Sequence, residues 1–133
     1  MHKQSWRKLL VIFLSMIFTT TFDSCSNGQF EQIGYYKKAL ANGANFRVFS
    51  VYVNEFKDTS DVWSKIEDYA RLKMYTPGGT TMVFFFKDRN MTPDVTFVGE
   101  NFDKKYEIYC VAGYWKYPNG KEKFAKYPFK YKQ

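Results

Sequence analysis

The alternation of apolar and polar positions predicts three regular elements in the middle of the chain. Phe46–Val53 and Thr80–Phe86 are rich in aromatic and β-branched residues, a composition typical of buried strands. Between them, apolar residues recur at helical spacing over Asp61–Tyr75, and Thr59 or Ser60 is available as the N-cap. This order predicts a β-α-β unit, whose two strands lie parallel or flank another strand of the same sheet.

The apolar stripe of the predicted helix is expected to face the core rather than a ligand. Its members are Trp63, Ile66, Ala70 and Met74, flanked by Val62 and Tyr69. The strand Thr80–Phe86 is the most apolar run after the N-terminal leader, so we expect it to be the central strand. The segment before it, Thr76-Pro77-Gly78-Gly79, has the Pro-Gly order of a type II turn.

Weaker patterns flank this unit on both sides. Apolar residues at helical spacing predict a helix over Phe30–Ala41, and a short strand is expected at Val95–Val98. The Asn-Gly pair of Pro118-Asn119-Gly120 predicts a hairpin between Glu107–Tyr117 and Lys121–Tyr127. The elements together predict a single small α+β domain. Its mixed β-sheet, with the β-α-β unit and a C-terminal hairpin, is covered by one or two helices.

The first 24 residues have the three-part organisation of an export signal. Lys3, Arg7 and Lys8 form a basic start, the run Leu9–Phe18 is apolar, and the polar stretch Thr19–Ser24 follows. A helix that crosses a bilayer needs about 20 apolar residues, and this run is roughly half as long. The pattern therefore predicts a cleaved signal peptide over residues 1–24.

The residues that end this leader, Phe22-Asp23-Ser24-Cys25, resemble the lipobox of bacterial lipoprotein precursors. The resemblance covers residues 1–27. It implies that the sulfur of Cys25 receives a diacylglycerol, that cleavage precedes Cys25, and that the protein is anchored in the cell envelope, at the outer membrane or the periplasmic face. Residues 25–29 would then be the anchor and a short spacer, and residues 30–133 one domain. Cleavage by an ordinary signal peptidase, which would yield a soluble periplasmic or secreted protein, is the alternative.

Composition narrows the possible functions. The chain is 21% aromatic and has a net charge of +7, which favours a globular, basic protein over a disordered one. Its one histidine, His2, lies in the leader, so Ser-His and Cys-His nucleophile pairs and His-ligated zinc are excluded from the mature chain. We predict no catalytic residues, no metal and no cofactor. The acidic residues Asp88 and Asp94 are interpreted as polar turn residues.

Lipidation of Cys25 would leave Cys110 without a disulfide partner. A lone cysteine in an apolar strand is most often a small buried hydrophobic residue, and we expect this of Cys110. The alternative is a small envelope enzyme or redox protein that uses Cys110 as a reactive thiol.

The C-terminal region interleaves lysines with aromatic residues and contains the candidate binding surface. Its members are Tyr114, Trp115, Lys116, Tyr117, Lys121 and Lys123. Such a surface could contact anionic lipid head groups, a glycan or an envelope protein. The competing interpretation is that alternate rings pack inward while lysines solvate the outer face and protect an edge strand. The export signal argues against nucleic acid as the partner. We therefore expect a non-catalytic binding or structural module of the envelope.

Overall fold

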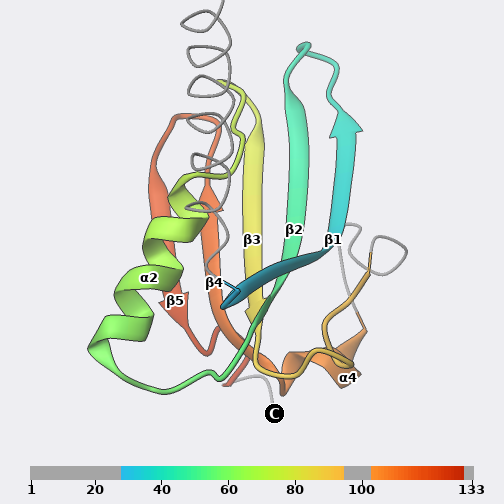
Figure 1. Cartoon of the computed structure of the whole chain (residues 1–133). Helices are drawn as coiled ribbons and strands as arrows, with labels where there is room; N and C mark the ends of the chain where they lie inside the picture. Colours follow the sequence, from blue (N-terminus) through green and yellow to red (C-terminus); the bar gives the residue numbers. More distant parts are fainter. Residues whose placement is uncertain (1–27, 95–102, 131–133) are drawn as a thin grey trace, which may run out of the picture.

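The computed structural model describes residues 28–94 and 103–130. Five strands form one sheet in the order β1-β2-β3-β4-β5 (Figure 1). Only β2 and β3 pair in parallel, and the other neighbours are antiparallel, so the sheet is mixed. The elements are β1 (Phe30–Ala39), β2 (Asn45–Val53), α2 (Ser60–Arg71), β3 (Thr80–Phe86), α4 (Lys104–Glu107), β4 (Cys110–Lys116) and β5 (Glu122–Lys126). The predicted α+β domain with a mixed sheet is confirmed.

The predicted β-α-β unit is formed by β2, α2 and β3. The two strands are direct neighbours, and their register runs from Phe46 opposite Thr80 to Tyr52 opposite Phe86. Because β3 has β2 on one side and β4 on the other, it is the central strand of the sheet, as predicted.

Helix α2 begins as expected but ends four residues earlier than predicted. The side chain of Thr59 is the N-cap and accepts a hydrogen bond from the backbone N–H of Val62 at 3.4 Å. The C-cap is Leu72, so Met74 lies outside the helix and is exposed, contrary to the prediction that it belongs to the core stripe. The other three members of that stripe are buried, which confirms the orientation of the helix.

The predicted helix over Phe30–Ala41 is wrong, because this segment forms strand β1. The register between β1 and β2 shifts between Gln32 and Gly34, which marks a β-bulge. A bulge shifts the alternation of a strand by one residue, so Phe30 and Tyr35 pack against the same core although they lie five residues apart, and the period-two pattern of a strand is lost from the sequence.

The two predicted turns are present. Gly78 has a φ of +82°, and the N–H of Gly79 donates to the carbonyl of Thr76 at 2.8 Å, as in a type II turn. A Cβ at position 79 would collide with the backbone oxygen of Asn45, so the turn packs closely against the start of β2. Gly120 has a φ of +81° in the turn that joins β4 to β5.

The first strand of the predicted hairpin starts later than expected. Residues Lys104–Glu107 form the single turn α4, and β4 begins at Cys110. The strand predicted at Val95–Val98 lies outside the described residues.

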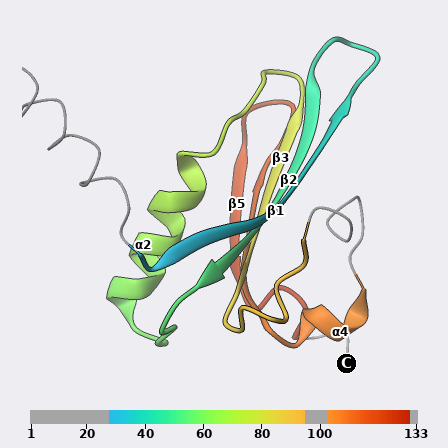
Figure 2. The same cartoon turned by 45° about the vertical axis from the view of Figure 1, so that its right-hand side comes forward.

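The two faces of the sheet are covered differently (Figure 2). On the first face, α2 packs over a large core. Its buried members are Phe49, Val51, Val53, Val62, Trp63, Ile66, Ala70, Val83, Phe85, Val111, Ala112 and Tyr114. On the second face, α4 and the residues after β3 cover one end of the sheet. The buried core there consists of Val48, Phe84, Phe86, Tyr106 and Cys110.

Asp58 joins the start of α2 to the C-terminal segment on the first face. One carboxylate oxygen accepts a hydrogen bond from Trp63 Nε1 at 2.6 Å, and the other accepts one from the Tyr127 hydroxyl at 3.2 Å. The hydrogen bond from Trp63 holds the pKa of Asp58 below its ordinary value, with smaller contributions from Tyr127 and two lysines. These contacts hold Trp63 and Tyr127 together at the edge of the first core, next to the start of α2.

We predict that Ile66→Ala lowers the free energy of unfolding by about 2–5 kcal/mol, because Ile66 is fully buried at the centre of the contact between α2 and the sheet. Urea denaturation followed by circular dichroism measures this change. Ser64→Ala, on the exposed side of the same helix, is the control and should change stability by less than about 0.5 kcal/mol. Equal effects of the two substitutions would contradict the assignment of this face of α2 to the core.

Candidate functional site

The six residues of the predicted binding surface lie in three different places on the domain. Trp115 and Lys123 lie opposite each other on the second face. Tyr114 points into the core of the first face, and Lys116 follows two residues later on the same side. Tyr117 and Lys121 border the exposed turn between β4 and β5, where the N–H of Tyr117 donates to the carbonyl of Lys121 at 2.9 Å. The structure therefore brings together Trp115 and Lys123, but not the whole predicted set.

Tyr114 is a core residue, so the prediction that it contributes to a binding surface is wrong. Its side chain is 2% exposed, and its hydroxyl donates a short hydrogen bond to the carboxylate of Glu122 on β5. Burial raises the pKa of Tyr114 above its usual range, and the bond to Glu122 raises it further. The ring thus packs beneath α2 while its hydroxyl is satisfied at the edge of the sheet.

The indole of Trp115 is held flat against the second face. A Cβ at position 113 would lie 2.5 Å from Cη2 and 2.9 Å from Cζ3 of this ring, so only glycine leaves room for it. Phe84 meets the indole nearly at right angles, with 5.6 Å between ring centroids. The Nζ of Lys123 lies 5.2 Å from the ring centroid, within the range of a cation–π contact.

Trp115 belongs to a group of partly exposed side chains that we call the apolar strip. Its members are Tyr36, Phe46, Met82 and Trp115, one each from β1, β2, β3 and β4. The register places Tyr36, Val48, Met82, Trp115 and Lys123 in a single row across all five strands. Since neighbouring strands lie about 4.8 Å apart, this row is roughly 19 Å long. Phe46 adjoins it and meets the Tyr36 ring edge-on, with 6.3 Å between centroids.

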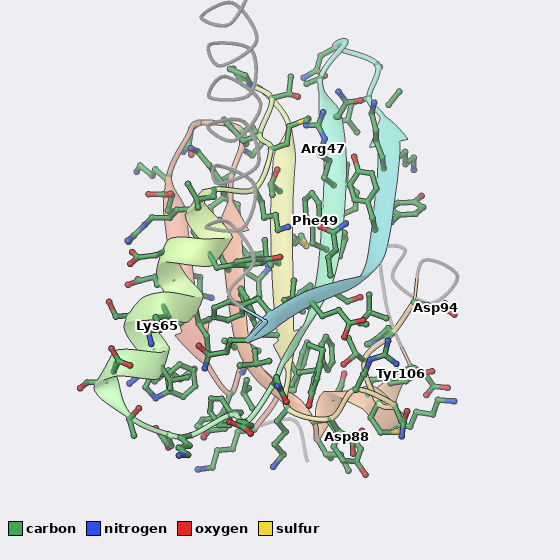
Figure 3. The ribbon with its side chains drawn as sticks, in the orientation of Figure 1. Arg47, Phe49, Lys65, Asp88, Asp94 and Tyr106 are labelled. Atoms are coloured by element: carbon green, nitrogen blue, oxygen red, sulfur yellow. The ribbon has the colours of Figure 1, made fainter. Side chains whose placement is uncertain are left out.

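The part of the second face beside the strip is packed by the residues that follow β3. The hydroxyl of Ser50 donates a short hydrogen bond to the carbonyl of Pro93, and Tyr106 of α4 is buried nearby in the same core. Asp88 organises this segment, because its side chain accepts from the N–H of Asn90 at 2.9 Å. That contact agrees with its interpretation as a turn residue. Asp88, Asp94 and Tyr106 mark this end of the molecule in Figure 3.

Sequence reasoning did not find Tyr36, Phe46 and Met82 as members of the site. Tyr36 was placed on a helix, and the other two were treated as strand core. No local signal could have found them, because the strip is assembled by strand pairing between residues that lie far apart in the chain. Adjacent residues of a strand point to opposite faces, so the alternation within β4 was the signal that could have separated Trp115 from Tyr114.

Cys110 is a buried free cysteine, as expected. It is 3% exposed, and its Sγ lies 3.3 Å from the carbonyl oxygen of Ala112. Burial raises the pKa of its thiol well above the ordinary value, and this disfavours the thiolate. The residue borders a cavity of about 310 Å³ whose wall includes Lys87, Glu107 and Lys130.

Neither the side chains of the described residues nor similarity to known proteins assigns a chemical reaction to this site. Over residues 28–94 and 103–130, no three His, Cys, Asp or Glu side chains gather in a way that could hold a metal ion. No helix in the same part of the chain is long and apolar enough to cross a membrane. No family model, no curated protein and no solved structure matches the chain at a significant level.

We predict that Cys110 reacts slowly with thiol reagents in the folded protein, because the thiol is both buried and protonated. In a Cys25→Ser variant, where Cys110 is the one remaining thiol, labelling with a maleimide at mildly alkaline pH should become fast only when urea unfolds the chain. Rapid, complete labelling of the native protein would contradict a structural role and favour the redox alternative.

Proposed function

We propose that this protein is a bacterial envelope lipoprotein, anchored through Cys25, whose domain binds a linear glycan on the apolar strip without catalysing a reaction. The observation that carries the binding proposal is the row of ring and thioether side chains that crosses the sheet from Tyr36 to Trp115 on the second face. The signal-peptide pattern and the lipobox-like residues before Cys25 support the anchor.

The shape of the strip favours a linear ligand. The row is one side chain wide with Phe46 beside it, and the four members of the strip are only partly exposed, so the strip offers far less than the about 800 Å² that each partner buries in a standard protein interface. The indole of Trp115 is fixed by Gly113 and Phe84, and a rigid aromatic ring is well suited to stack on the apolar face of a sugar. Lys123, at the end of the row, can donate to sugar hydroxyl or carboxylate groups.

The position of Cys25 favours a partner other than the bilayer for the second face, which carries the apolar strip. Gly28 borders a shallow pocket with Asp61, Val62 and Lys65 of α2, so the chain enters the domain on the first face. Cys25 lies three residues before Gly28, a reach of at most about 11 Å. A lipid on Cys25 would therefore hold the first face near the membrane and leave the apolar strip directed away from it.

The alternative of an enzyme or redox protein built on Cys110 receives no support from the site. Its thiol is buried and its pKa is raised, whereas a reactive cysteine needs an accessible thiolate.

For the anchor, we predict that mass spectrometry of the mature protein finds acyl mass on an N-terminal Cys25, and that Cys25→Ser releases the protein from the membrane fraction. Stable attachment requires more than one acyl chain, so the expected mass corresponds to multiple acylation. A mature chain whose Cys25 carries a bare thiol would contradict the anchor and favour the soluble alternative.

For the strip, we predict that Trp115→Ala and Tyr36→Ala each weaken binding to linear oligosaccharides by about tenfold, corresponding to about 1.4 kcal/mol for one lost ring contact. Binding is measured first on an array of neutral and acidic oligosaccharides and then by calorimetry, with circular dichroism to confirm folding. Tyr117→Ala is the matched control, because Tyr117 is an exposed tyrosine at the hairpin turn outside the strip. The proposal fails if no oligosaccharide binds, or if the control substitution has the same effect as the two others.

A further inference from the structure

Two apolar side chains stand out from the loop that follows α2. Leu72 is 85% exposed and Met74 is 64% exposed, the highest values for large apolar residues in the described part of the chain. A single exposed leucine is ordinary on a soluble protein. Here two such side chains occupy alternate positions, and the basic residues Arg71 and Lys73 flank Leu72.

The loop is held in place, so the exposure of these side chains is a feature of the fold. Its backbone is fixed by Thr81, whose hydroxyl donates to the carbonyl of Met74 at 2.8 Å. Tyr75 donates from its hydroxyl to the carbonyl of Tyr117 at 2.8 Å, and Arg47 donates from Nη1 to Oγ1 of Thr76 at 2.7 Å.

Positive charge gathers around the loop. Lys116 Nζ lies 4.5 Å from the centroid of the Tyr75 ring, whereas Arg47 is buried beneath Thr76 and does not reach the surface. Lys73 is half-buried: it donates to the neutral side chain of Gln32 at 2.8 Å, and its Nζ lies 4.5 Å from the centroid of the Tyr69 ring, so its charge is free of any carboxylate partner among the described ion pairs. None of the ion pairs between described residues includes Arg47, Lys73 or Lys116. Two partly exposed lysines, Lys73 and Lys116, therefore lie beside the exposed Leu72 and Met74, the combination that favours an anionic lipid surface.

The loop lies on the same face of the domain as the entry of the chain. The residues after Gly28 run along α2, since Phe30 stacks on Tyr69 with 4.7 Å between centroids and Gln32 meets Lys73. Gly28 adjoins the first turns of α2, and the loop follows its last turn, about 18 Å away along a 12-residue helix. Figures 1 and 2 show α2 and this loop on one side of the sheet.

The exposed surface of α2 between these two points carries little net negative charge, so its repulsion from an anionic membrane is weak. Asp61 is paired with Lys65 at 3.1 Å, and Glu67 is paired with Arg71 at 3.4 Å. These i,i+4 pairs balance most of the negative charge on the helix.

We propose that the segment from Arg71, the last residue of α2, to Tyr75 is a second contact with the bilayer, in which Leu72 and Met74 enter the boundary between head groups and acyl chains and Lys73 approaches anionic head groups. This inference rests on the anchor at Cys25 that the proposed function includes. With one contact near each end of α2, the helix lies along the membrane and the apolar strip faces away from it.

The test measures the depth of single labelled positions in the acylated protein. Leu72→Cys, Met74→Cys and Ile108→Cys are each made in a Cys110→Ala background, labelled with a fluorophore, and reconstituted into phosphatidylcholine vesicles with added phosphatidylglycerol. Quenching by nitroxide lipids is compared with quenching by aqueous iodide. Ile108 is the matched control, because it is an exposed apolar residue (56%) after α4, on the other side of the sheet.

The ratio of lipid quenching to iodide quenching should be about tenfold higher at positions 72 and 74 than at position 108, since interfacial side chains lie about 5–10 Å into the head-group boundary. Lys73→Glu should lower this ratio at position 72 on anionic vesicles, whereas Lys123→Glu on the second face should not.

Three results would overturn the inference. If the acylated protein floats with vesicles but the three positions are quenched alike, the loop does not touch the membrane while the anchor stands. If position 72 is shielded from iodide without lipid quenching, a protein or a second copy of the chain covers it instead. If Cys25 carries no acyl chain and the protein does not float, the anchor fails together with this contact.

Discussion

The parallel pairing of β2 with β3 requires that the central strand be covered on both faces. Val83 and Phe85 of β3 point to the first face, and Phe84 and Phe86 point to the second, so both faces of this strand carry large apolar side chains that are buried. Helix α2, which makes the crossover between the two strands, covers the first face with Ile66 at the centre of the contact. The second face has no comparable helix and is covered by short segments from elsewhere in the chain.

This unequal cover determines where a binding surface can form. The residues after β3 pack over Ser50 and Phe86, and the C-terminal Phe129 adds to the contact with Phe84. The four members of the apolar strip lie beyond them and stay partly exposed, whereas Val48, between Tyr36 and Met82 in the row, is buried. Because its members come from adjacent strands of a rigid sheet, the row presents its rings at fixed spacing. Gly113 contributes by its missing side chain, which lets the indole lie flat.

The two sides of the domain thus suit two different neighbours. The α2 side carries the entry of the chain near Gly28 and the apolar, basic loop around Leu72, and in the proposed arrangement this side faces the membrane. The opposite side carries the apolar strip and Lys123. A protein held this way would present its binding surface to the space beyond the membrane, which is what a tethered glycan-binding module requires.

Local patterns in the sequence predicted the strands β2 and β3, the start of α2, the two glycine-containing turns and the hairpin, because each depends on residues close together in the chain. They failed for β1, where a bulge disturbed the alternation, and for the end of α2, where the loop that leads to β3 takes Met74 out of the helix. Of the predicted surface, Trp115 and Lys123 meet on one face, whereas Tyr114 turned inward to pack beneath α2 and bond to Glu122. The sequence by itself determined the strands β2 and β3, the start of α2 and the two glycine-containing turns. Only the tertiary structure decided which rings share a face, because strand register joins residues that no local pattern connects.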